Sequence, residues 1–159
     1  MHQHNTLMLR NLAAKDLALL VEIETDPANL IYSGWKTPPE IDELIALIQD
    51  DGEFNQRGQK RFVIELDRQA VGFADLFDAT SDLKCCYVGI LVIPEMRRHG
   101  IALDALHLLQ KEAQQFGLNT LMAKCLRENI ASINLFEKAG YKIETSTTEF
   151  VVLQCTIDS

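Results

Sequence analysis

The chain has 159 residues, 47% of them hydrophobic and 24% charged, and a formal net charge of −8. The length suits one compact domain over residues 1–159, and the negative charge disfavours nucleic acid, whose binding needs Lys and Arg to neutralise phosphates. The four cysteines show neither metal-ligand nor disulfide-framework spacing, and no apolar run approaches the ~20 residues that span a bilayer. The opening residues lack the layout of a secretory signal. We therefore expect a reduced cytoplasmic protein with no metal, membrane or nucleic-acid partner.

The spacing of apolar residues and the positions of glycine and proline predict the elements of a mixed domain. Thr37 is typical of an N-cap, because two prolines and a glutamate follow it. Residues 51–60 are polar, contain two glycines and predict a flexible loop. The predicted elements are strand 6–12, helix 16–25 ended by a break at 26–29, helix 37–50, hairpin strands 61–66 and 70–77, strand 88–93, a helix from 101 that ends at 117–119, strand 120–126, helix 129–140, and strands 141–147 and 149–157.

The stretch of residues 88–106 has the pattern around which the rest is arranged. Residues 88–93 are a continuous apolar run, typical of a strand buried on both faces, and Pro94 ends it. Two arginines, a histidine and Gly100 then precede an apolar pattern at helical spacing. The first N–H groups of a helix lack intrahelical acceptors, and glycine lets the backbone approach an anion closely. These residues indicate a phosphate site or an ordinary strand-to-helix connection with solvated arginines, and by themselves favour neither.

The sequence R-x-x-G-x-A at residues 97–102 resembles the pyrophosphate-binding signature of the GNAT superfamily of acetyl-CoA-dependent N-acetyltransferases. One helix and one strand later, residues 129–141 (NIASINLFEKAGY) resemble the family's second segment, N-x-x-A/S-x-x-x-Y/F-E-K-x-G-F/Y. The two segments in this order and at this distance form a strong match. Residues 7–10 and 16–17 are also similar to the branch of spermidine and ribosomal-protein-alanine N-acetyltransferases. The resemblance covers nearly the whole chain, most densely over residues 88–141.

The resemblance implies an α+β fold with a mixed, mostly antiparallel sheet flanked by helices, in which the parallel fourth and fifth strands splay apart. The pantetheine arm of acetyl-CoA would lie in the splay and bond to the backbone around Leu91 and Ile93, as an added strand does. A capping asparagine, a solvent-facing serine or a turn histidine in water would give the same pattern at three of the positions. The implied cofactor-binding residues are Leu91, Val92, Ile93, Arg97, Arg98, His99, Gly100, Ile101, Ala102, Asn129, Ser132 and Phe136.

The family's catalytic positions differ here. The common A-E-I-G-I of the fourth strand is C-Y-V-G-I at residues 86–90, so Tyr87 takes the glutamate position and is the catalytic candidate, as a phenol that orders a water. The thiolate-protonating tyrosine of the second segment is replaced by Phe136. The family's layout implies that Glu24, Tyr32 and Trp35 line the acceptor pocket, although Trp35 would equally serve as a core residue.

We therefore expect an N-acetyltransferase that moves acetyl from acetyl-CoA to a primary amine by direct attack in a ternary complex. The amine would be a small molecule or a protein N-terminus, and the sequence leaves a homodimer open. The changes at Tyr87 and Phe136 favour the alternative, a non-catalytic acyl-CoA-binding sensor or regulatory domain. A structural domain without cofactor is disfavoured by the intact segment 97–102.

Overall fold

The computed structural model describes residues 6–30, 37–49, 54–97 and 99–157. The chain divides into two compact units, a larger one of Met1–Arg10 with Glu53–Ser159 and a smaller one of Asn11–Gly52. That residues 1–159 form a single domain stays a prediction. Among the described residues, no helix is both long enough and apolar enough to cross a bilayer.

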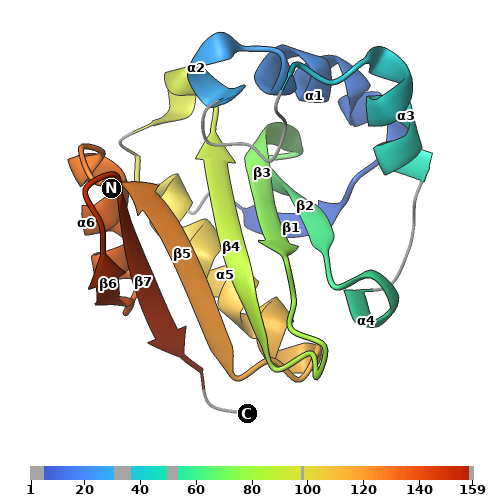
Figure 1. The fold of residues 1–159 in the computed structure, drawn as a ribbon. Coiled ribbons are helices and arrows are strands. Elements are labelled where there is room, and N and C mark those ends of the chain that lie inside the picture. The colour runs from blue at the N-terminus through green and yellow to red at the C-terminus, as the bar shows by residue number, and fades with distance from the viewer. Residues whose placement is uncertain (1–5, 31–36, 50–53, 98, 158–159) are drawn as a thin grey trace. The chain divides into compact units, whose positions relative to one another are not determined.

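The described strands form one seven-stranded sheet in the order β1-β2-β3-β4-β5-β7-β6 (Figure 1). Strands β4 and β5 are parallel, whereas the pairs β2–β3, β3–β4, β5–β7 and β6–β7 are antiparallel. The predicted mixed, mostly antiparallel sheet is thereby confirmed. The strands are β1 (Leu7–Asn11), β2 (Lys60–Leu66), β3 (Gln69–Phe77), β4 (Cys85–Val92), β5 (Thr120–Leu126), β6 (Lys142–Ser146) and β7 (Phe150–Thr156).

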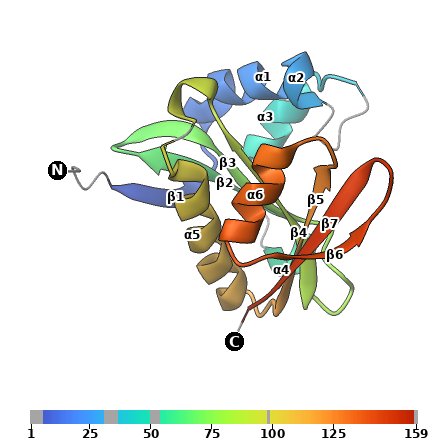
Figure 2. The same ribbon diagram turned by 90° about the vertical axis from the view of Figure 1, so that its left-hand side faces the viewer.

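Two helices cover one side of this sheet (Figure 2). Helix α5 (Ile101–Gln115) packs on β3 and β4, and α6 (Ile130–Lys138) packs on β5, β6 and β7 and against α5. The apolar face of α5 provides much of the core, with buried side chains at Ile101, Ala105, Leu106, Leu109 and Ala113.

Helix α5 ends where the sequence predicts. Gly117 has a left-handed backbone (φ 88°), and its N–H donates to the carbonyl of Gln114 at 3.0 Å. The N–H of Leu118 reaches back to the carbonyl of Ala113 at 3.1 Å, which completes a Schellman cap. Leu118 is fully buried, so the cap also returns the chain to the core before β5 begins.

The central strand differs from the expectation of burial on both faces. Strand β4 begins at Cys85, earlier than predicted, and its burial alternates. Cys86, Val88 and Val92 are buried in the core cluster that includes α5, whereas Tyr87 and Gly89 are only partly buried. The reason is that α5 and α6 cover a single face, so β4 has the period of a one-sided sheet.

The predicted polar loop at residues 51–60 contains a short helix, α4 (Phe54–Arg57). Phe54 is fully buried, and its ring stacks on that of Phe116 with centroids 5.0 Å apart. One buried aromatic side chain therefore anchors α4, although the surrounding sequence is polar.

The smaller unit consists of a 3₁₀ turn (Ala14–Asp16) and helices α1 (Leu17–Glu24), α2 (Pro27–Leu30) and α3 (Ile41–Gln49). The predicted break at residues 26–29 ends α1 but then forms α2. Helix α3 starts later than the predicted Thr37 cap. The Glu40 N–H donates to the carboxylate of Glu43 at 3.2 Å. The two prolines before Glu40 explain the shift, because a residue that precedes proline avoids the helical region.

Candidate functional site

Strands β4 and β5 separate along their length (Figure 1). They pair only at Cys85–Thr120, Cys86–Leu121 and Tyr87–Met122. Beyond Tyr87, β4 keeps its partner β3 on one side and has no described strand beside it on the other. The backbone polar groups along this open edge lack the partners that a continuous sheet would give them. This geometry confirms the expected splay.

Alternation along β4 decides which backbone groups point to the open edge. The Ile93 N–H donates to the carbonyl of Val71 at 2.8 Å, so it points toward β3. The carbonyl of Leu91 also lies against β3, only 2.1 Å from where a Cβ on Gly72 would stand. The groups that face β5 are therefore those of Ile90 and Val92. Backbone bonds from Leu91 and Ile93 to a pantetheine arm, as expected from the sequence, disagree with this register.

Arg97 is attached to this open edge. Its Nε donates to the carbonyl of Val92 at 3.0 Å, and its side chain is otherwise exposed. The hydrogen bond fixes one edge of the guanidinium group beside the end of β4, directly before α5. A positive charge thus stands between the open strand edge and the N-terminus of a helix.

The N-terminus of α5 has the features of an anion site. The first helical bond is donated by Asp104 to Gly100 at 3.1 Å, so the N–H groups of Ile101, Ala102 and Leu103 precede any intrahelical acceptor. Among the residues that the structure describes, no side-chain hydrogen bond caps this end. Gly100 has φ 76°, and no atom lies within 4 Å of where its Cβ would be. Among the described residues, the space around the Gly100 Cβ position is therefore open.

His99 and Arg98 complete the turn that the sequence predicts to bind the cofactor. His99 is exposed beside Gly100. Arg98 lies outside the described residues. The cofactor role predicted for both stays a prediction.

The start of α6 places Asn129 and Ser132 together. The Asn129 side chain accepts the Ser132 N–H at 3.1 Å and caps the helix, as its alternative interpretation holds. The Ser132 hydroxyl lies 3.4 Å from the sulfur of Cys125 on β5. Burial raises the pKa of that thiol, which keeps it protonated at neutral pH. These contacts are structural, and contact with a cofactor stays a prediction.

The two positions where the family has catalytic side chains carry packed rings. Tyr87 stacks on Phe77 with centroids 5.9 Å apart. Phe136 is 4% exposed and meets Tyr141 edge to face at 5.0 Å. That contact belongs to the C-cap of α6, where the Tyr141 N–H bonds to the Phe136 carbonyl at 3.0 Å and Gly140 has φ 98°. The Phe136 ring is thus a core group.

The predicted acceptor residues belong to the smaller unit. Glu24 ends α1, and its side chain is buried. Tyr32 and Trp35 lie outside the described residues. Their role in binding an amine stays a prediction.

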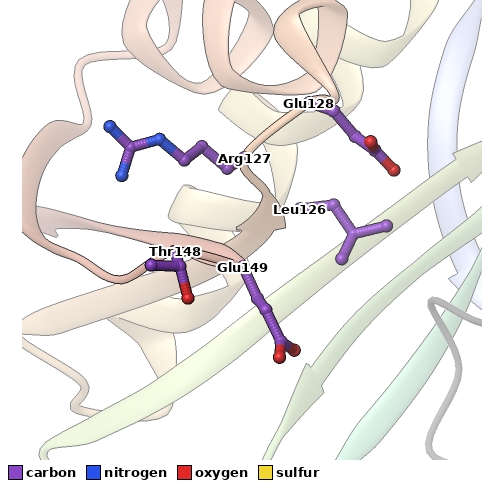
Figure 3. A pocket seen from close by; sticks show the side chains of 5 residues that line it. All are labelled: Leu126, Arg127, Glu128, Thr148 and Glu149. Carbon is purple, nitrogen blue, oxygen red and sulfur yellow. The ribbon is translucent and has the colours of Figure 1, made fainter.

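A pocket of about 380 Å³ that the sequence did not indicate lies where β5 ends. It is lined by Leu126, Arg127, Glu128, Thr148 and Glu149. Figure 3 shows both carboxylate side chains extending on the same side as Leu126, with Arg127 extending away from them.

A turn holds this pocket together. The Arg127 N–H donates to the Glu149 carbonyl, and its Nη1 donates to the Thr147 carbonyl, both at 2.8 Å. The sequence predicts Arg127, Glu128 and Thr148 between elements and Glu149 as the first residue of a strand. It does not predict that they meet, because their meeting depends on the β5–β7 pairing.

Comparison with known proteins agrees with this geometry. The family described as "Acetyltransferase (GNAT) domain" matches residues 6–142. Spermidine N(1)-acetyltransferase of Escherichia coli K12 is 24% identical over 147 residues, which are 88% of this chain and 75% of that protein.

Two solved structures share the fold. Spermidine N-acetyltransferase from Vibrio cholerae, crystallised with CoA and spermine, superposes with a TM-score of 0.81 at 19% identity, over 94% of this chain and 95% of that one. RimL, a ribosomal L7/L12 alpha-N-protein acetyltransferase, gives a TM-score of 0.79 at 20% identity, over 96% and 91%.

Proposed function

This chain belongs to the GNAT acetyltransferase family, with acetyl-CoA as its acetyl donor, and on that premise we propose that it acetylates a primary amine by direct attack within a ternary complex. The observation that carries the proposal is the continuous run from the open edge of β4 to the uncapped N-terminus of α5. An extended amide chain can bond along the edge, and a pyrophosphate can accept from the helix N–H groups.

The residues that would hold the donor follow from that run. Ile90 and the N–H of Val92 offer backbone groups at the open edge, whereas the Val92 carbonyl already accepts from Arg97. The Arg97 guanidinium and the N–H groups of Ile101 and Ala102 would bind the pyrophosphate. Bound acetyl-CoA supplies the acetyl group as an activated thioester. The protein's task is to hold a neutral amine in line with it, and well-oriented reactants gain roughly 7–11 kcal/mol of the barrier. Phe136 has no proton to give, so we assign protonation of the departing thiolate to solvent.

The acceptor we propose is a cationic amine, either a small polyamine-like molecule or a protein N-terminus. Glu128 and Glu149 support it, since two carboxylates that line one pocket attract a cation. The relatives named above act on spermidine and on a ribosomal protein. Glu24, Tyr32 and Trp35 stay part of this proposal, as do a cytoplasmic location and the open question of a homodimer.

The test is release of free CoA thiol from acetyl-CoA in the presence of a panel of spermidine, a peptide with a free N-terminus, an amino sugar and an aminoglycoside. We expect at least one amine to accelerate thiol release well above hydrolysis, with the acetylated amine found by mass spectrometry. A panel without any acetylated product, on protein that binds acetyl-CoA, would reject acetyl transfer.

That second result would favour a non-catalytic acyl-CoA-binding domain. The packed rings at Tyr87 and Phe136 are the observation in its favour, because Phe136 has no exchangeable proton and the Tyr87 ring is stacked on Phe77. The two functions separate cleanly: both predict acetyl-CoA binding, and only the first predicts turnover.

A further inference from the structure

A single carboxylate lies within the three strands that surround the splay. Strands β3, β4 and β5 contain one acidic residue, Asp75 on β3. Asp75 pairs directly with Gly89, and the neighbouring pair on that face is Phe77 with Tyr87. The other face carries Leu76 and Val88, which belong to the core cluster that includes α5. Asp75 and Tyr87 therefore share the face that turns away from α5.

The absence of a side chain at Gly89 leaves Asp75 open toward β4. A Cβ built on Gly89 would stand 3.7 Å from Asp75 Oδ2 and 3.6 Å from the Phe77 ring, so the carboxylate leans over the β4 backbone. Gly89 is two residues beyond Tyr87, the last β4 residue that pairs with β5. The carboxylate thus lies beside the point where the two strands separate.

The Tyr87 side chain packs against β3. Its ring stacks on Phe77 of β3 at 5.9 Å with an interplanar angle of 28°. In the family pattern that position carries a glutamate, and here the ring covers β3 next to Asp75. The carboxylate missing at Tyr87 is therefore present one strand away.

We infer that Asp75 is the carboxylate that binds and orients the attacking amine, in place of the glutamate that β4 lacks. This inference rests on the proposed acetyl transfer and adds the residue that receives the acceptor. Asp75 accepts a hydrogen bond from the amine nitrogen while that nitrogen forms its bond to the acetyl carbon. The carbon–sulfur bond breaks with its electron pair on sulfur, and the proton from nitrogen passes to solvent water.

Arg61 determines how Asp75 is presented. Its Nε donates to Oδ1 at 2.8 Å and its Nη2 to Oδ2 at 2.9 Å, a two-point contact across the β2–β3 pair. Each carboxylate oxygen can accept a second hydrogen bond. The side chains of Arg61 and Asp75 are 25% and 23% exposed, so the pair is reachable yet held in one geometry. A purely structural cross-strand ion pair is the competing explanation, and the test has to separate the two.

Three variants make that separation, measured with the amine of the panel that the parent acetylates fastest. Asp75→Asn keeps the size and one acceptor of the side chain and removes its charge. Gly89→Ala leaves the ion pair intact and places a methyl group over Oδ2, at contacts of ordinary van der Waals length. Asp75→Asn combined with Tyr87→Glu returns a carboxylate to the family's position. Asp78→Asn, at an exposed residue after β3, is the matched control for loss of one negative charge.

We expect Asp75→Asn to raise the amine KM or lower kcat/KM for the amine by roughly ten- to a hundredfold, as for loss of a hydrogen bond to a charged group. The acetyl-CoA KM should stay within about twofold. Gly89→Ala should weaken amine use in the same direction without lowering the melting temperature, and Tyr87→Glu should recover much of the loss in the Asp75→Asn background. If Asp75 and Arg61 form only a structural ion pair, Gly89→Ala should leave the amine kinetics unchanged. Tyr87→Glu should then not restore activity in the Asp75→Asn background.

Unchanged amine kinetics in Asp75→Asn, or equal effects on both substrates, would overturn the inference. If the parent acetylates no amine, the proposed function fails, and calorimetric titration of spermidine into the CoA-saturated protein decides the inference instead. Binding that is lost in Asp75→Asn and kept in Asp78→Asn supports Asp75 as the amine-binding carboxylate. Binding that is equal in both, or absent from the parent, overturns it.

Discussion

Two neighbouring regions match the family pattern to different degrees: the end of β4 with the turn that follows it, and the middle of β4. At the end, Val92, Arg97 and Gly100 keep an open strand edge, a fixed positive charge and an uncapped helix. In the middle of β4, Tyr87 packs on Phe77. The family's other catalytic position, Phe136 on α6, packs on Tyr141. The proposed donor site consists mainly of backbone groups, whereas proton transfer in the family depends on side chains.

This difference explains why the proposed donor site can be recognised in the sequence and the catalytic positions cannot. Backbone N–H groups survive any substitution except proline, so an anion site needs only the helix, its glycine and an arginine. A general base or acid is lost with a single side chain. The comparison therefore predicts that changes near Gly100 act on binding of the donor, and that changes at Tyr87 and Phe136 act on packing more than on chemistry.

The largest expected effect is at Phe136. Phe136→Ala should lower the free energy of unfolding by roughly 3–5 kcal/mol, because it removes a buried ring that holds the C-cap of α6. Urea denaturation measures it. Phe136→Leu, which keeps an apolar core side chain, should retain the parent kcat in the amine assay. A loss of stability below about 1 kcal/mol would contradict the core role of the ring. A kcat that falls a hundredfold in Phe136→Leu would show that the ring acts in the reaction.

Two left-handed glycines give the next test. Gly100 at the start of α5 and Gly140 after α6 both have positive φ, and neither Cβ position has an atom within 4 Å. Alanine at either should cost about 1–2 kcal/mol of stability through backbone strain. Only Gly100→Ala should also weaken acetyl-CoA binding, by about tenfold or more in calorimetric titration, since it adds a methyl group at the residue directly before α5, beside the proposed anion site. Equal acetyl-CoA affinities of Gly100→Ala and Gly140→Ala would contradict an anion site at the N-terminus of α5.

Many of the turns and helix ends can be predicted from the sequence, because the residues that determine them are neighbours in the chain. The Asn129 cap, the stop at Gly117 and the turn at Asp67 and Arg68, whose φ angles are 50° and 71°, each depend on a few neighbouring residues. Such features are fixed by backbone sterics and short-range hydrogen bonds. The family resemblance supplied the splay of β4 and β5.

The rest depends on pairing that no local pattern records. Asp75 looks like an ordinary strand residue until the β3–β4 register places it opposite Gly89. Which of Ile90, Leu91, Val92 and Ile93 faces the open edge likewise follows from one hydrogen bond, between Ile93 and Val71. Phe54 illustrates the same limit, since its partner Phe116 is distant in sequence.

A smaller effect is expected at Tyr87. Tyr87→Phe keeps the ring that stacks on Phe77 and removes only the hydroxyl. We expect kcat to fall less than about tenfold, because a directly acting acid or base contributes about 10²–10⁴-fold and a group that orders water contributes less. Steady-state kinetics at saturating acetyl-CoA measures it. A hundredfold fall with unchanged donor binding would make the phenol a catalytic group.

The smallest effect concerns pH and the buried thiol of Cys86. Burial raises the pKa of Cys86 from 9.0 to about 12, so the folded state binds this proton more tightly than the unfolded state. The resulting stability is complete below pH 9 and is lost as the pH rises toward 12. Between pH 8 and 10 the free energy of unfolding should fall by about 1 kcal/mol more in the parent than in Cys86→Ala. Free energies of unfolding that change equally with pH in the parent and in Cys86→Ala would contradict this expectation.

The most direct measurement of the central claim is the melting temperature with and without acetyl-CoA. At about 100 times the dissociation constant, binding to the folded state adds roughly 2.7 kcal/mol. For a chain of 159 residues this predicts a rise of about 5–10 °C, at roughly 2–4 °C per kcal/mol. A melting curve that saturating acetyl-CoA leaves unmoved would contradict a donor site at β4 and α5.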